Sequence, residues 1–153
     1  MPSLELKIPP PVVAFIVAVA MWGASLGGAA WPVPDIVRLA LALALVAVGV
    51  AFSAAGIVEF RRARTTLNPR KPEAASSLVS LGVFKITRNP MYVGLFLVLV
   101  GWAVVLSSLW ALLGPLAFAL YIHRFQITPE ERVLSSMFGA EYLAYKERVR
   151  RWL

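Results

Sequence analysis

Long uncharged stretches separated by short polar segments form the pattern of this chain. Residues 12–30 and 39–58 carry no charged side chain, and neither do the 32 positions of 91–122. Each of the first two stretches is about as long as a helix that crosses a bilayer, which needs about 20 apolar residues. A single helix over 91–122 would measure about 48 Å, against a hydrocarbon core of about 30 Å. We therefore predict two helices there, with a break at Ser107-Ser108.

This pattern predicts an all-α integral membrane protein, a bundle of four transmembrane helices with a cytoplasmic C-terminal amphipathic helix. The expected spans are about 12–30, 36–59, 91–107 and 109–125, within a single domain over 1–153. A cytoplasmic polar loop is expected at 60–90 and a cytoplasmic tail at 126–153. We also expect the first two helices to pack as a hairpin, because small residues recur in them every four positions. These residues are Ala20, Ala24 and Gly28, then Ala47, Ala51 and Ala55, with Gly49 and Ser53 as a further pair.

The distribution of charge supports four spans. With both termini in the cytoplasm, 14 of the 15 Lys and Arg residues lie on the cytoplasmic side, and only Arg38 lies outside. Trp31 and Trp110 would then mark the same outer interface. Topology and contact with anionic membrane lipids account for the formal net charge of +7, so we do not expect nucleic acid as a partner.

Composition excludes several kinds of chemistry. The chain of 153 residues is 59% hydrophobic and contains no cysteine, which excludes disulfides, thiolate nucleophiles and cysteine-bound metals. Its one histidine, His123, provides little for a metal site, and we expect no metal. The sequence also lacks a hydrolytic triad and a phosphate-binding Walker loop.

The start of the third span is the most informative stretch. Asn89 is a suitable N-cap and Pro90 a suitable first helical residue, so a helix is expected to begin here. Free backbone N–H groups and the helix dipole would then lie beside Arg88 and Lys85, which together could hold an anion. The alternative is an ordinary helix start with basic residues at the membrane surface.

The tail has the pattern of an amphipathic helix. Thr128 and Glu131 have the spacing of a capping box, and Pro129 suits the first helical position. Apolar residues follow at helical spacing with basic residues between them, so the tail is expected to lie against the membrane or the bundle. Gly139 is expected to divide this helix in two.

A hairpin of the last two spans would gather polar residues at their cytoplasmic ends. The members are Arg88, Asn89 and Tyr92 from one helix, Tyr121, His123, Arg124 and Gln126 from the other, and Glu130 and Glu131 just beyond. Such a mixture of cations, carboxylates and aromatic rings suits a zwitterion with a separate cationic centre, and S-adenosylmethionine is one. Each residue also has an ordinary role as an interfacial anchor or helix cap, so these residues alone leave the function open.

Two motifs resemble one known family. Thr87-Arg88-Asn89-Pro90-Met91-Tyr92-Val93-Gly94 resembles the Arg-His-Pro-x-Tyr-x-Gly motif of the isoprenylcysteine carboxyl methyltransferases and related phospholipid methyltransferases. Glu130-Glu131-x-x-Leu134, Phe138-Gly139-x-x-Tyr142-x-x-Tyr145 and Val149-Arg150-Arg151-Trp152 resemble the C-terminal signature of the same family. The resemblance covers residues 80–153 and keeps the order and spacing of both motifs.

The resemblance implies an S-adenosylmethionine site between the last two helices and the tail, with a lipophilic or lipid-like methyl acceptor entering from the bilayer. Arg88 and Glu131 are then the expected catalytic residues. Asn89 stands where the family usually has histidine, so a hydrogen-bonding role is carried over but not a titrating imidazole. The cofactor-binding residues implied are Arg88, Asn89, Pro90, Tyr92, Gly94, His123, Arg124, Glu130 and Glu131.

Several alternatives remain at this point. A phospholipid or another amine could be the acceptor instead of a carboxylate, and Glu131 or Glu130 would then serve as the base. Membrane reductases that use NADPH are related to this family in their C-terminal halves, but the short polar segments here offer little for a 2′-phosphate. A small four-span transporter or membrane scaffold is a different class; small multidrug transporters rely on a buried acid in their first helix, and 12–30 has none.

Overall fold

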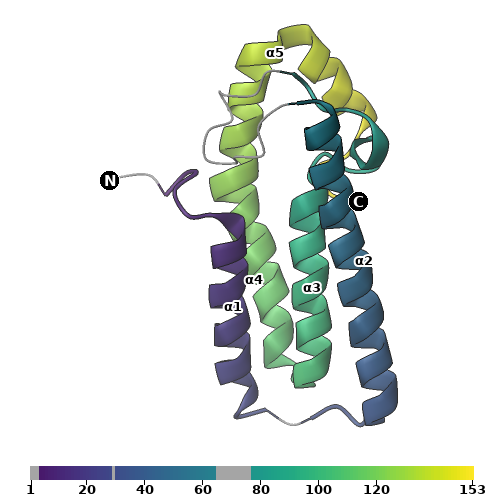
Figure 1. Ribbon diagram of the computed structural model, residues 1–153. Coiled ribbons are helices and arrows are strands. Elements are labelled where there is room, and N and C mark those ends of the chain that lie inside the picture. The colour runs from purple at the N-terminus through teal and green to yellow at the C-terminus, as the bar shows by residue number, and fades with distance from the viewer. Residues whose placement is uncertain (1–3, 29, 65–76) are drawn as a thin grey trace.

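The computed structural model describes residues 4–28, 30–64 and 77–153, and these form an all-helical bundle without β-strands (Figure 1). The α-helices are α1 (Pro10–Ser25), α2 (Asp35–Arg62), α3 (Pro90–Leu106), α4 (Leu113–Ile122) and α5 (Thr128–Arg148). Two short 3₁₀ helices, η2 (Gly82–Lys85) and η3 (Trp110–Leu112), and a π-helical segment, η4 (His123–Ile127), complete the order. Part of the polar loop predicted at 60–90, residues 65–76, lies outside the described residues.

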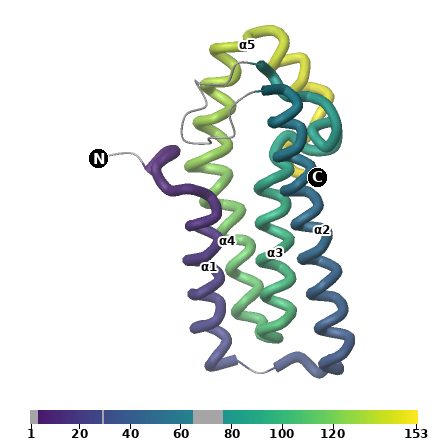
Figure 2. Tube along the Cα trace, viewed as in Figure 1, coloured from purple at the N-terminus to yellow at the C-terminus, as the bar shows by residue number. Residues whose placement is uncertain are grey.

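The helices pack in an order that differs from the predicted one. α2 packs along α3, whereas α1 packs against α3 and α4 on the other side, as the tube in Figure 2 shows. The prediction that α1 and α2 form a hairpin is therefore wrong. The reason lies in Gly49, which allows a close approach to α3: a Cβ atom there would lie 2.6 Å from the carbonyl oxygen of Gly94.

Length distinguishes α2 from the other helices. By length and composition it is the one helix among the described residues that can cross a membrane, whereas α1 and α3 are apolar but have 16 and 17 residues. The four-span arrangement stays a prediction. The expected break is confirmed, because α3 ends at Ser107 in the left-handed conformation, with φ of 51°. The backbone N–H of Trp31 donates to the carbonyl oxygen of Ser107 at 3.2 Å, so the segment between α1 and α2 is joined to the end of α3.

The C-terminal helix does not start afresh after α4. The chain continues from α4 through η4 into α5, and the capping box predicted at Thr128 is absent: its hydroxyl donates instead to the carbonyl oxygen of His123 at 2.8 Å. A continuous helix leaves no free N–H groups there for a cap to satisfy. The predicted division at Gly139 is confirmed by its φ of 50° and ψ of −124°. Beyond this bend the rest of α5 turns back over the upper end of the bundle (Figure 1).

The folded-back part of α5 is fastened to the segment that precedes α3. Phe84 and Tyr145 belong to one buried cluster, and the Tyr145 hydroxyl donates to the carbonyl oxygen of Phe84 at 2.7 Å. Val149 completes this contact at the end of α5. The packing places the C-terminal residues beside the loop 86–89, which leads into α3.

Candidate functional site

The loop that starts α3 is held by the C-terminal segment of the chain. Pro90 is the first residue of α3, as predicted, and Asn89 occupies the N-cap position. The Asn89 side chain makes no capping bond, however, and its Nδ2 atom donates to the carbonyl oxygen of Arg151 at 2.8 Å. The buried Thr87 hydroxyl donates to the same oxygen at 3.2 Å. The backbone N–H of Arg88 donates to the carbonyl oxygen of Arg150 at 3.0 Å, so the two segments are joined along their length.

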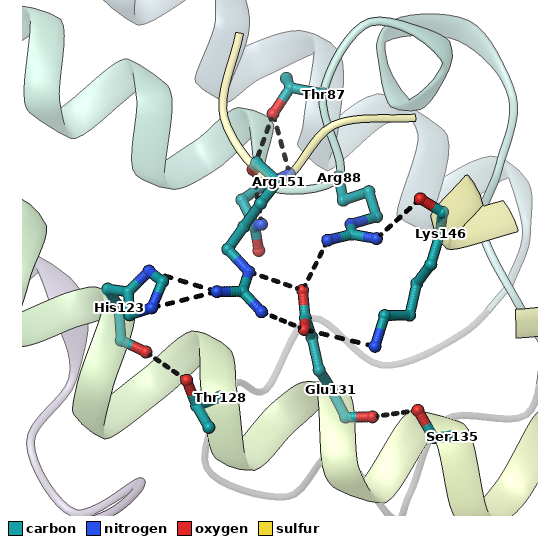
Figure 3. A network of polar contacts seen from close by, with 9 residues as sticks. Thr87, Arg88, His123, Thr128, Glu131, Ser135, Lys146 and Arg151 are labelled. Carbon is teal, nitrogen blue, oxygen red and sulfur yellow. Dashed lines mark hydrogen bonds and ion pairs between the residues drawn. The ribbon is translucent and has the colours of Figure 1, made fainter. Parts of the chain in front are cut away.

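A cluster of charged side chains surrounds Glu131 (Figure 3). Arg151 binds both carboxylate oxygens, with Nη2 2.6 Å from Oε2 and Nε 3.0 Å from Oε1. The Nη2 atom of Arg88 donates to Oε1 at 3.0 Å, and Lys146 Nζ lies 3.7 Å from Oε2. Glu131 is 7% exposed. Three cations therefore share one buried carboxylate, and we call these four residues the charge cluster.

The cations decide the ionisation of Glu131. Burial raises the pKa of Glu131, but the hydrogen bonds and positive charges of Arg151, Arg88 and Lys146 outweigh that effect and hold the pKa below its usual value. Glu131 is therefore ionised at neutral pH. Since one negative charge faces three positive ones, the cluster retains a surplus of positive charge that can attract an anion.

His123 and Arg124 are the two polar residues predicted just before the glutamates, and the structure brings only His123 to the charge cluster. The ring nitrogens of His123 lie 3.0 and 3.3 Å from Arg151 Nη1. Arg124 instead pairs with Glu5 at 2.8 Å, and its side chain is 60% exposed. The structure thus places Arg124 away from the charge cluster, beside the N-terminal segment.

Glu130 forms a separate pair with the first turn of α3. The hydroxyl of Tyr92, itself buried, donates to Oε1 of Glu130 at 2.6 Å. Burial raises the pKa of Glu130 to about 8; the charge of Glu131 adds to this effect and the hydrogen bond from Tyr92 opposes it. Two adjacent glutamates therefore differ at pH 7: Glu131 is charged, and Glu130 is mostly protonated.

This difference predicts a pH dependence of stability. Because the pKa of Glu130 is raised on folding, the folded protein holds the proton more tightly between its unfolded pKa, near 4.5, and about 8. The stabilisation of the fold by this proton is fully present below pH 4.5, and it is lost as the pH rises to about 8. We expect the wild-type melting temperature to fall between pH 5.5 and 8.5, and Glu130→Gln to remove most of that fall. A thermal melt in detergent followed by circular dichroism measures both; equal slopes in the two proteins would contradict the assignment.

Two residues of the charge cluster were not singled out from the sequence. Arg151 and Lys146 were expected only as basic residues of an amphipathic tail. The signal available for Arg151 was its place in the C-terminal signature, next to Trp152, whose ring packs against Phe96 with centroids 6.2 Å apart. Gly94, expected to bind cofactor, lies against Gly49 and Ser53 of α2, and its role toward a cofactor stays a prediction. Among the residues that the structure describes, no three His, Asp or Glu side chains gather in a group that could hold a metal ion.

Comparison with known proteins finds related sequences in bacteria, a plant and yeast. An uncharacterized protein of Haemophilus influenzae is 49% identical over 63 residues, which are 41% of this chain and all of that protein. Protein-S-isoprenylcysteine O-methyltransferase A of Arabidopsis thaliana is 34% identical over 110 residues, 70% of this chain and 54% of the plant enzyme. Protein-S-isoprenylcysteine O-methyltransferase of Saccharomyces cerevisiae is 36% identical over 85 residues, 52% of this chain and 33% of the yeast enzyme. The chain thus spans about half the length of the plant enzyme and about a third of the length of the yeast enzyme.

No solved structure matches the chain. The phospholipid methyltransferase family matches it over residues 37–141, a range that contains α3, α4, all but the first two residues of α2 and α5 as far as residue 141. Within this range lie Arg88, Tyr92 and both glutamates of the site. The match extends over more than half of the chain, so the protein belongs to the phospholipid methyltransferase family.

Proposed function

We propose that this protein is an integral membrane methyltransferase that moves a methyl group from S-adenosylmethionine to a lipophilic acceptor. The observation that carries the proposal is the charge cluster around Glu131, at the end of a bundle of apolar helices, in a chain of this family. The apolar helices suit an acceptor that enters from the bilayer. In the proposed topology four helices span the membrane, and both termini and the site face the cytoplasm, since 14 of 15 basic residues then lie on that side.

The residues of the site fit the groups of this cofactor. Arg88, Arg151 and Lys146 provide more positive charge than Glu131 neutralises, so a ligand carboxylate can be bound there. Glu131 can bind an ammonium group or ribose hydroxyls, which need acceptors. S-adenosylmethionine, when bound, supplies a methyl group on a positively charged sulfur.

We propose a carboxylate as the acceptor, as in the relatives named for isoprenylcysteine O-methylation. The surplus positive charge of the cluster attracts an acidic group and repels a protonated amine. A carboxylate oxygen needs no base: it forms a bond to the methyl carbon while the carbon–sulfur bond breaks, which leaves a neutral methyl ester and a neutral thioether. The task of Arg88 and Glu131 is then to orient the reactants and exclude water from the site.

An amine acceptor is the alternative within the same family. The observation that favours it is Glu130: with a pKa of about 8, its ionised form is a stronger base than an ordinary carboxylate and can accept the proton that an amine must lose. In this case the phenol of Tyr92, 2.6 Å away, holds the base in place.

Methylation of extracted lipids tests the proposal and separates the two acceptors. Purified protein in detergent is incubated with a lipid extract and methyl-labelled S-adenosylmethionine, and label in the organic phase is counted before and after mild base. We expect label that base removes, because a methyl ester is base-labile. Label that resists base would indicate N-methylation. If the protein binds neither S-adenosylmethionine nor S-adenosylhomocysteine, the proposed function is wrong.

A further inference from the structure

A buried amide oxygen near the charge cluster has no partner. Gln126, in η4, is fully buried, and its Nε2 atom donates to the carbonyl oxygen of Ile8 at 2.7 Å. Its Oε1 atom has no hydrogen-bond partner among the described residues. An acceptor that is buried without a hydrogen bond destabilises the folded protein. Since nearly all buried polar groups of native proteins are hydrogen-bonded, this atom points to a donor other than the residues that the structure describes.

The N-terminal segment fixes the orientation of this amide. The backbone N–H of Leu6 donates to the carbonyl oxygen of Phe125 at 3.0 Å, and Glu5 forms ion pairs with Arg124 and Arg132 at 2.8 and 2.7 Å. These contacts hold Ile8 beside η4. Because the Ile8 carbonyl can only accept a hydrogen bond, the amide must present its NH₂ group to it, and Oε1 is left for another donor.

The position of Gln126 relates it to the candidate site. It comes three residues after His123, which contacts Arg151, and four residues before Glu130, which binds Tyr92. Gln126 therefore lies along the chain between the residue of η4 and the residue of α5 that reach the two parts of the site. A second buried oxygen without a partner among the described residues, the hydroxyl of Tyr121, comes from the same stretch of helix.

The chemistry of the Gln126 Oε1 atom indicates which group of a bound cofactor can be its hydrogen-bond donor. The oxygen is a neutral acceptor, so it does not suit a carboxylate, and the charge cluster is better suited to the charged amino-acid end. The same stretch of helix carries two aromatic rings, those of Tyr121 and Phe125, with centroids 4.9 Å apart, and such rings offer apolar surface for a planar base. The neutral donor of S-adenosylmethionine on its planar base is the 6-amino group of adenine.

We propose that Gln126 is a specificity-determining residue whose Oε1 atom accepts a hydrogen bond from the adenine 6-amino group of the bound cofactor. This inference rests on the proposed function and adds a recognition residue outside the charge cluster. The N-terminal segment contributes indirectly, because Ile8 holds the amide in the orientation that selects a donor.

Binding of two ligands that differ in one group tests the inference. S-adenosylhomocysteine and its analogue with hydrogen in place of the 6-amino group are titrated into the detergent-solubilised protein by calorimetry. We expect the wild type to prefer the amino compound about tenfold, as the loss of one buried hydrogen bond predicts. Gln126→Met keeps the side-chain size and removes the acceptor, so its preference should fall to about twofold or less. The matched control is Ile127→Met, the neighbouring fully buried residue, which should keep the wild-type preference.

Each other outcome overturns the inference. If Gln126→Met weakens both ligands by the same factor, Gln126 is a structural residue or binds water. A wild-type protein that binds both ligands equally contradicts the inference alone, and this result needs no variant, so it stands even if Gln126→Met fails to fold. A wild-type protein that binds neither ligand removes the proposed function together with the inference.

Discussion

Replacing Glu131 with glutamine is expected to lower the free energy of unfolding by about 3 kcal/mol and to abolish methyl transfer. The variant keeps the size of the side chain but removes the negative charge that three cations share. Arg88 is affected most, because its side chain is 9% exposed and its other partner, the carbonyl oxygen of Lys146 at 3.3 Å, carries no charge. We place the loss at the lower end for a broken buried ion pair, since Arg151 and Lys146 are partly exposed and water screens them.

Thermal unfolding in detergent, followed by circular dichroism, measures the stability, and calorimetry with S-adenosylhomocysteine measures the site. Glu141→Gln is the matched control: it removes the same charge from an exposed position of α5 and should change neither quantity. Glu131→Asp keeps the charge with a shorter reach, so it should recover more stability than activity. A Glu131→Gln protein that methylates at the wild-type rate would exclude Glu131 from the proposed site.

The second large effect is expected from adding one methyl group at Gly94. The Cβ atom of alanine would overlap the carbonyl oxygen of Gly49 and the hydroxyl of Ser53. Because a backbone oxygen cannot turn away, α2 and α3 must move apart, at a cost of about 2–3 kcal/mol. Tyr92 lies two residues before Gly94, so this shift also disturbs the Tyr92–Glu130 hydrogen bond and should lower activity.

Gly23 provides the control for Gly94→Ala. It lies within α1, and a Cβ atom there would meet nothing within 4 Å, so Gly23→Ala should be neutral or stabilising by up to about 1 kcal/mol. Combining Gly94→Ala with Ser53→Ala should restore little, since the Gly49 oxygen still obstructs the methyl group. Thermal melts of these variants decide the matter: equal stability of Gly94→Ala and wild type would contradict the close packing of α2 on α3.

Helix boundaries and helix partners were predictable to different degrees. Local patterns predicted the break at Ser107, the start of α3 at Pro90 and the bend at Gly139. They did not reveal that α1 packs against α3 and α4 rather than α2, because small residues recur in α1 and α2 alike and spacing does not identify the partner. The capping box failed at Thr128 for a similar reason: the same residues are compatible with a helix start and with a helix that continues.

The candidate site was likewise predictable from the sequence only in part. Residue type and position along the chain were sufficient to identify Arg88, Tyr92 and the two glutamates as candidate site residues. The opposite ionisation of Glu130 and Glu131 could not be predicted, because two adjacent glutamates look alike until burial and the neighbouring cations separate their pKa values.

The sequence by itself determined that the protein is helical, rich in long apolar stretches and similar to a methyltransferase family, because periodicity, composition and motifs are properties of neighbouring positions. Only the tertiary structure brought Arg151 to Glu131, 20 positions away along the chain, and tied the C-terminal segment to the start of α3. The physical reason is that the bend at Gly139 and the packing of Tyr145 on Phe84 fold the end of the chain back, and such contacts between distant segments leave no local pattern in the sequence.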